Sequence, residues 1–153
     1  MKKILSIILC AVCTVFSSGV QDGGPNSSAD NIAGLYFVSH EGENSKVRIS
    51  RDTDGTFKAQ VIWLENRMDS DGNVRLDEKN PDKSLKDTPC DRIVIIEKLS
   101  YNPDRQRWEK GKIYDPTRGI RANATCSFDS PDTLRIRGSL MGIGETVFWK
   151  KLE

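Results

Sequence analysis

The sequence has one histidine, one long hydrophobic run and no excess of charge of either sign. Its 153 residues include 23 Lys+Arg and 22 Asp+Glu, scattered along the chain, for a net charge of +1. Without a basic stripe to neutralise phosphates, nucleic acid is not an expected partner. Because His40 is the sole histidine, multi-histidine metal sites are excluded and a Ser/His/Asp or Cys/His site would have to use it. His40 stands in a polar stretch typical of an exposed turn, so we do not expect it to be catalytic. No metal ligand, cofactor site or catalytic residue is assigned from the sequence.

The one long hydrophobic run lies at the N-terminus and indicates export. Lys2 and Lys3 precede an apolar run over residues 4–16, and small residues then permit cleavage after Gly19. The run is shorter than the roughly 20 residues that span a bilayer, and no second run follows. We therefore predict a signal peptide over 1–19, a periplasmic or secreted domain and no transmembrane segment. Residues 20–30, rich in Gly, Ser, Asn and Asp, predict a flexible linker.

Two cysteines lie outside the predicted signal peptide, Cys90 and Cys126. An oxidising compartment would permit a disulfide between them. Cys126 also belongs to an alternating apolar series, which is equally consistent with two buried free thiols. The sequence leaves both alternatives open.

From residue 31 onward the hydrophobic pattern has the two-residue period of β-strands. An Asp54-Gly55 pair between two alternating runs is typical of a β-hairpin. A helical turn is predicted only at 82–86, within a long insertion over 65–91. Eight strands are expected, at 32–38, 45–51, 56–64, 91–99, 107–114, 119–128, 132–140 and 145–152. Antiparallel strands in succession, without crossover helices, predict an all-β, up-and-down eight-stranded barrel over 31–153 with one long loop between strands 3 and 4.

A barrel of eight strands is wide enough either to be filled by its own side chains or to hold one small ligand. The inward series Ala122, Ala124 and Cys126 is small and favours a cavity. The aromatic residues are numerous enough to fill the interior instead. Both alternatives stay open at this point.

Two polar stretches stand apart from ordinary turns, at residues 77–82 and 111–119. Each combines acidic or amide side chains with a proline, a composition that fixes backbone turns. We regard them as the candidate rim of a ligand site, with an arginine from a later strand as a polar anchor. The candidate ligand-binding residues are Asp77, Asn80, Asp82, Tyr114, Asp115 and Arg137.

Four ordered motifs carry a resemblance to a known family. They are D-x-x-N-P-D-x-x-L-K at 77–86, G-K-I-Y-D-P-T-x-G at 111–119, L-R-I-R-G at 134–138 and G-x-G-x-T-x-x-W-K at 142–150. In this series the chain resembles the secreted bacterial family called domain of unknown function 2147, over residues 31–152. The resemblance implies a lipocalin-like (calycin) β-barrel behind a signal peptide, and no activity.

Members of that family begin the barrel with Gly-x-Trp and end it with Trp-x-Arg, an arrangement in which the late cation packs over the early ring. This chain has Tyr36 in place of the tryptophan and Lys151 in place of the arginine. The resemblance therefore implies a weaker lysine-over-tyrosine contact.

Three functions follow from these observations, in descending order of preference. The first is non-catalytic binding of a small, partly apolar ligand in the barrel, which an interior cavity below about 100 Å³ would contradict, against the 300 Å³ or more of typical ligand sites. The second is an envelope structural or protein-interaction module with a filled core. The third is a hydrolase that uses Asp77, Asp82 or Asp115.

Overall fold

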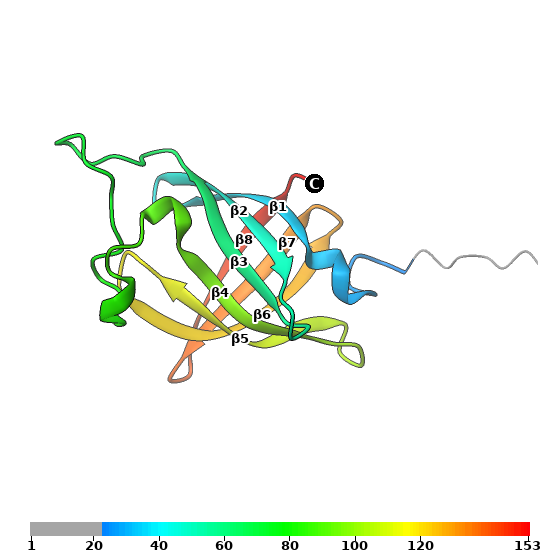
Figure 1. The fold of residues 1–153 in the computed structure, drawn as a ribbon. Coiled ribbons are helices and arrows are strands. Elements are labelled where there is room, and N and C mark those ends of the chain that lie inside the picture. Colours follow the sequence, from blue (N-terminus) through cyan, green and yellow to red (C-terminus); the bar gives the residue numbers. More distant parts are fainter. Residues whose placement is uncertain (1–22) are drawn as a thin grey trace, which may run out of the picture.

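The structure is a computed structural model that describes residues 23–153. Eight antiparallel strands follow one another in chain order, and the last pairs with the first to close a barrel (Figure 1). The strands are β1 (Gly34–His40), β2 (Glu43–Arg51), β3 (Phe57–Leu64), β4 (Val94–Asn102), β5 (Arg107–Asp115), β6 (Ile120–Ser130), β7 (Thr133–Leu140) and β8 (Ile143–Lys151). Three short 3-10 helices accompany them: η1 (Ala29–Ile32), η2 (Lys83–Leu85) and η3 (Cys90–Arg92). The predicted all-β, up-and-down barrel is confirmed.

The long loop between β3 and β4 was predicted together with its helical turn. Asp82 caps η2, because its side chain accepts a hydrogen bond from the backbone nitrogen of Ser84 at 2.9 Å. β4 begins at Val94, three residues later than predicted, because residues 90–92 form η3. The residues in this stretch form a 3-10 turn, and the alternation of apolar and polar residues alone does not distinguish such a turn from a strand.

The two-residue period places small and large apolar side chains inside the barrel. On β6, the side chains of Ala124, Cys126 and Phe128 are buried. Cys126 pairs with Ile136 and Phe128 with Leu134, so the apolar faces of β6 and β7 point to the same core. The inward series predicted for β6 is therefore confirmed in these positions.

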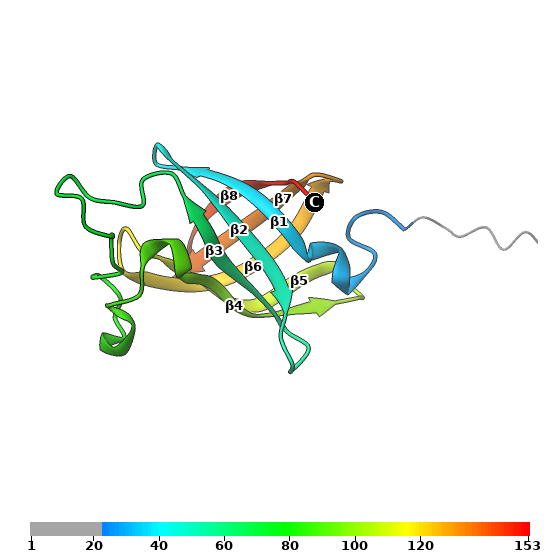
Figure 2. The ribbon, with the colours of Figure 1, turned by 45° about the horizontal axis from the view of Figure 1, so that its top comes forward.

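Bulky side chains fill one end of the barrel, which we call the closed end. The indole of Trp108 packs edge-on against Phe128, with ring centroids 5.8 Å apart. Its Nε1 donates to the backbone oxygen of Ala29 at 3.0 Å, which ties η1 across this end. Tyr36 and Phe57 are fully buried in the same core. Figures 1 and 2 show η1 at the closed end and the loop between β3 and β4 at the opposite end.

Residues just ahead of η1 belong to the closed end. The Asn26 side chain donates to the Phe128 carbonyl at 2.9 Å and accepts from the Phe128 nitrogen at 2.7 Å. The Tyr101 hydroxyl donates to the Asn26 carbonyl at 2.6 Å. The flexible linker predicted over 20–30 thus contains an anchored part, because Asn26 is hydrogen-bonded to β6 and β4 and η1 begins at Ala29. The predicted signal peptide lies outside the described residues.

Within residues 23–153, no helix has the length and apolar character that crossing a membrane would require.

The seam between β1 and β8 closes the barrel. Tyr36 pairs with Lys151 and Phe37 with Lys150, and the backbone of Leu35 exchanges hydrogen bonds with Leu152 and Glu153 at 2.7 and 3.0 Å. Gly34 is required at the start of this seam. Its φ is +148°, and a Cβ atom at this position would overlap the carbonyl oxygen of Glu153.

The contact implied between Lys151 and Tyr36 is wrong. The ring of Tyr36 packs against Trp149, with centroids 6.1 Å apart, and its hydroxyl donates to the Ile32 carbonyl at 2.7 Å. Lys151 Nζ lies 5.6 Å from the centroid of Phe128 and donates to the Asn31 carbonyl at 2.6 Å. The late cation therefore fastens the segment ahead of β1 rather than covering the first aromatic ring.

We predict that Gly34→Ala lowers the free energy of unfolding by more than about 3 kcal/mol, because backbone strain adds to the overlap with Glu153. The matched control is Gly42→Ala. Gly42 also has a positive φ, +81°, but open space around its Cβ position, so the loss should be about 1–2 kcal/mol. Urea unfolding followed by tryptophan fluorescence measures both. Equal losses would contradict the role assigned to the seam.

Candidate functional site

The half of the barrel away from η1 is hollow. A cavity of about 790 Å³ occupies it, well within the 300–1,000 Å³ range of small-molecule sites. Its walls are apolar side chains from strands on all sides of the barrel: Val38, Val61, Ile95, Ile113, Ala122, Val147 and Trp149. The lining also includes residues next to the turns at 41–42 and 141–142, residues 116–118 and parts of the loop over 65–93. We call the turns at 41–42, 116–119 and 141–142 and this loop the mouth.

The space exists because β6 and β7 have small residues at inward positions. Ala122 pairs with Ile113, and Ala124 pairs with Gly138. A Cβ atom on Gly138 would come within 3.3 Å of Ile113 Cγ2 and 3.8 Å of Ala122 Cβ. The aromatic side chains of Tyr36, Phe57, Trp108 and Phe128 are at the closed end, and Trp63 is exposed. Tyr114, Phe148 and Trp149 line the cavity but do not fill it. A filled interior is therefore wrong for this half of the barrel.

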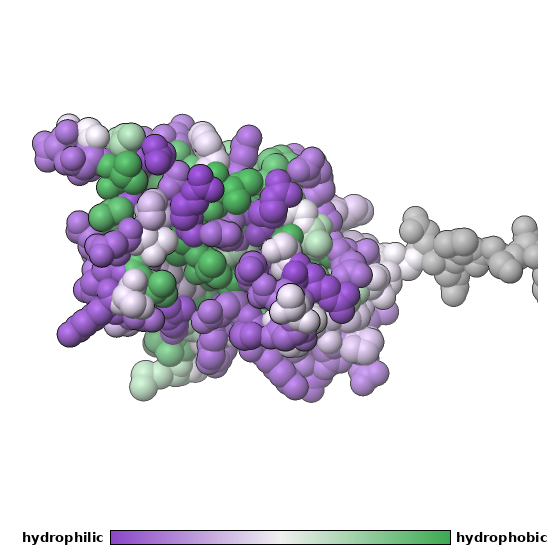
Figure 3. Space-filling view, viewed as in Figure 1, coloured by the Kyte–Doolittle hydropathy of each residue, from purple (hydrophilic) through white to green (hydrophobic). Residues whose placement is uncertain are grey.

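The loop over 65–93 is held against the barrel at the mouth. Backbone hydrogen bonds run from Asp77 to Thr88 and from Cys90 to Arg75, each 2.9 Å long, and the Val61 nitrogen donates to the Ile93 carbonyl at 2.9 Å. Both ribbon views place this loop beyond the ends of β3 and β5 (Figures 1 and 2). Apolar side chains are exposed among hydrophilic ones towards this end of the molecule (Figure 3).

A buried polar cluster joins this loop to β5. The Tyr114 hydroxyl donates to Asp77 Oδ1 at 2.6 Å, and Asn80 Nδ2 donates to Asp77 Oδ2 at 2.7 Å. All three residues are buried, and Asp77 is only 2% exposed. Burial, together with the hydrogen bond to Asp77, raises the pKa of Tyr114 above its ordinary value. The phenol therefore stays protonated and remains the donor.

Glu43 and Arg75 form an ion pair in the cavity wall. Arg75 Nη1 and Nη2 lie 2.5 and 3.3 Å from the two carboxylate oxygens of Glu43, and Nη1 also donates to the Asn66 carbonyl at 2.7 Å. The hydrogen bond that Arg75 donates to the Glu43 carboxylate raises the pKa of Arg75. The two residues are 32 positions apart, and no local spacing in the sequence indicated the pair.

Arg118 connects its own turn at 116–119 with the turn at 41–42 and with the beginning of β8. Its guanidinium lies 3.2 Å from Glu41, 3.2 Å from Glu145 and 3.5 Å from Asp115. Asp115 Oδ1 also accepts from the backbone and hydroxyl of Thr117, at 2.8 and 2.6 Å. Since Asp115 and Thr117 belong to the Y-D-P-T motif, that motif shapes the rim and places Arg118 at its centre.

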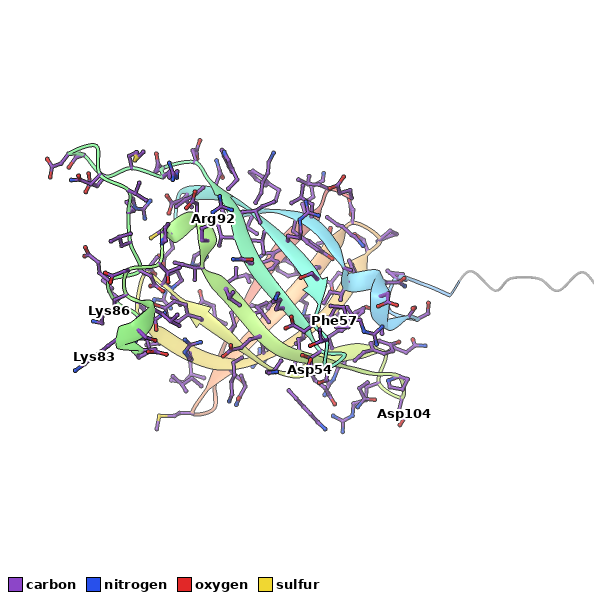
Figure 4. All side chains as sticks on the ribbon, in the orientation of Figure 1. Asp54, Phe57, Lys83, Lys86, Arg92 and Asp104 are labelled. Atoms are coloured by element: carbon purple, nitrogen blue, oxygen red, sulfur yellow. The ribbon has the colours of Figure 1, made fainter. Side chains whose placement is uncertain are left out.

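The structure brings together some of the predicted site residues and separates others. Asp77, Tyr114 and Asp115 line the cavity, and Asn80 supports Asp77 from a smaller adjacent pocket of about 120 Å³. Asp82 is exposed and serves as the cap of η2, close to where Lys83 and Lys86 project from the loop (Figure 4). It does not line the cavity.

Arg137 does not line the cavity. Its side chain is exposed on the outer face of β7, and its guanidinium lies over Gly144. Because Leu134 and Ile136 on the same strand point inward, the two-residue period itself places Arg137 outside. An exposed arginine on this face cannot anchor a ligand inside the barrel.

His40 belongs to a strand and not to a turn, and the cysteines follow one of the two alternatives that the sequence left open. His40 ends β1, is partly exposed and contributes to the mouth, with Nε2 3.9 Å from Glu41 Oε1. Cys90 and Cys126 are free thiols, so the tentative disulfide is absent from the structure. Cys126 points into the core from β6, whereas Cys90 lines the cavity from η3. Burial raises the pKa of both thiols.

Comparison with known proteins agrees with this architecture. Residues 34–151 match the family described as "Uncharacterized protein conserved in bacteria (DUF2147)". The chain belongs to this family. A similar solved structure, described as "Protein HP1028 from the human pathogen Helicobacter pylori belongs to the lipocalin family", has a TM-score of 0.63 and 24% identity, over 79% of this chain and 82% of that one. At this identity the likeness shows a lipocalin-like fold alone. No curated protein matches the chain.

We predict that Tyr114→Phe costs about 1–3 kcal/mol, because it leaves a buried oxygen of Asp77 without its donor. The effect should concentrate in the loop, as faster hydrogen exchange at the amides of Asp77, Asn80 and Thr88. Tyr101→Phe is the matched control, since it removes a comparable hydroxyl bond, to Asn26, at the closed end. Equal protection of the loop amides in both variants would contradict the anchoring role of Tyr114.

Proposed function

We propose that this DUF2147 barrel binds a small, partly apolar ligand in its open half, without catalysing a reaction on it. The observation that carries the proposal is the 790 Å³ cavity, with apolar walls, a polar rim and one open end. The lipocalin-like fold permits such a site but does not identify a ligand, because folds host many functions. Asp77, Tyr114 and Asp115, at the rim, are the polar groups that a bound molecule would meet.

The three carboxylates that a hydrolase would use all accept hydrogen bonds from neighbouring groups, which favours binding over hydrolysis. Asp115 accepts hydrogen bonds from the backbone nitrogens of Thr117 and Arg118. Asp82 accepts from Ser84, outside the cavity. Asp77 accepts from Tyr114 and Asn80 through both of its oxygens. Each side chain thus maintains the local structure of the mouth.

Filling the cavity tests the proposal. Ala122→Phe places a ring in the space between β5 and β7 and should weaken binding of the neutral apolar probe N-phenyl-1-naphthylamine by more than about tenfold. Asn123→Phe, the next residue on the same strand, is exposed and should leave binding unchanged. The measurement is probe fluorescence at increasing protein concentration.

Cys90 offers an independent readout in the same experiment. Because this thiol lines the cavity, bound probe should slow its alkylation by iodoacetamide in the wild type and in Asn123→Phe. Cys126 is buried in the core and serves as the internal reference. Unchanged probe binding in Ala122→Phe, or alkylation of Cys90 that the probe does not slow, would contradict binding in the cavity.

A second candidate function is supported by the turn between β7 and β8. Met141 at its tip is 96% exposed, and Ile143 is 80% exposed. Large apolar side chains in such positions are typical of contact surfaces. An envelope protein bound at this turn would be retained by Ala122→Phe, whereas a cavity ligand would not.

We further propose that the domain is exported, on the strength of the residue pattern at 1–19. Deletion of residues 2–19 should retain the protein in the cytoplasm of a bacterial host, while the full chain is recovered from the periplasm or the medium. Cell fractionation followed by intact-mass measurement checks both the compartment and the predicted cleavage after Gly19. Export of the deletion variant would contradict the proposal.

A further inference from the structure

The side chains that line the cavity include more carboxylates than cations. Three cations contribute to its lining, namely Arg75, Lys79 and Arg118. Six carboxylates contribute as well, namely Glu43, Asp69, Asp77, Glu78, Asp115 and Glu145. A surface with this excess presents a negative potential to a molecule entering the cavity.

Each of the three cations is already engaged by groups of the protein. Arg75 makes its two-pronged contact with Glu43. Arg118 is surrounded by three carboxylates at the mouth. Lys79 Nζ donates to the carbonyl oxygen of Thr117 at 2.6 Å. An anionic head group would have to displace one of these partners in order to gain a cation.

Asp77 differs from these cations, because its hydrogen-bond partners are neutral groups. Both of its oxygens act as acceptors, the hydrogen-bonding role of an ionised carboxylate, and both donors are neutral groups, Tyr114 and Asn80. Among residues 23–153, none of the ion pairs within 4.0 Å includes Asp77. Arg92 and Arg121 line the smaller pocket that Asp77 also borders, but neither forms one of these ion pairs with it. The buried charge of Asp77 therefore has neutral donors as its direct partners, and it acts strongly across a poorly polarisable cavity.

We infer that the ligand is an amphiphile with a cationic head group, such as a protonated amine or a quaternary ammonium, whose apolar tail enters the barrel. This inference rests on the proposed binding function and adds the chemical class of the ligand. The head lies among the carboxylates of the mouth, with Asp77 and Tyr114 at its inner side. The apolar walls from Ile113 to Trp149 hold the tail, and fatty-acid carboxylates are disfavoured.

Two probes with the same chain and opposite heads test the inference. Dodecyltrimethylammonium and dodecanoate are titrated into the full domain by isothermal calorimetry, below their micelle-forming concentrations, at about pH 8 and low salt. The cationic probe should bind at least about tenfold more tightly, and the ratio should shrink at about 0.5 M salt because the charges are screened. Equal or tighter binding of dodecanoate would overturn the head-group inference while the binding function stands. Failure of both of these probes and of N-phenyl-1-naphthylamine would overturn the binding function itself.

A charge-removing variant gives the sharper test. Glu43→Gln keeps the size of the side chain and one acceptor oxygen but leaves the Arg75 guanidinium without a counter-charge in the cavity wall. Dodecanoate should then bind about tenfold more tightly than to the wild type, and dodecyltrimethylammonium more weakly. Thermal unfolding verifies that the variant is folded.

The matched control is Asp30→Asn. Asp30 lies 3.0 Å from Arg51 and belongs to η1 at the closed end, so this variant removes the same charge from an arginine pair that lines neither the cavity nor the smaller pocket. The ratio between the two probes should stay at its wild-type value. If Glu43→Gln and Asp30→Asn shift the ratio equally, net charge alone accounts for the effect and the inference is overturned.

Discussion

The pairing of β1 with β8 is the interaction on which the rest of this structure depends. A sheet of eight strands with one apolar face has two open edges unless its first and last strands meet. Here they meet over a short stretch around Tyr36 and Lys151, reinforced by backbone bonds from Leu35 to the last residues of the chain. The side chain of Lys151 extends the same contact to Asn31. Since the interior exists only while the sheet is closed, the cavity depends on this narrow seam.

The barrel is divided along its axis by the sizes of its inward side chains. Trp108 and Phe128 occupy the closed end and are sealed by η1, whereas Ala122 and Gly138 leave the other end empty. The closed end contains the buried aromatic rings of Trp108 and Phe128, which stabilise the fold. The open end is thereby free to combine an apolar interior with charged turns. Stability and the proposed binding thus depend on different halves of the same strands.

The alternation of apolar and polar residues predicted most of the fold, because a half-buried strand has to expose every second side chain. The same rule places Arg137 outside, and assigning it to a binding site conflicted with its own strand. Local sequence patterns could not predict which distant segments contact one another. Glu43 meets Arg75 across 32 positions and Tyr114 meets Asp77 across 37. The D-x-x-N and Y-D-P motifs did mark Asp77 and Tyr114, since buried polar residues in proline-containing turns need partners, but which residue pairs with which followed only from the closed sheet.

Both ends of the described chain leave the barrel on the same side. The segment at Asn26 is bonded to β6 at the closed end, and the final residues lie beside Gly34 at the start of β1 (Figure 1). The opening therefore faces away from both termini. If the protein were attached to a surface through either terminus, the attachment would be at the closed end. The mouth would then point away from the surface and stay accessible to solutes.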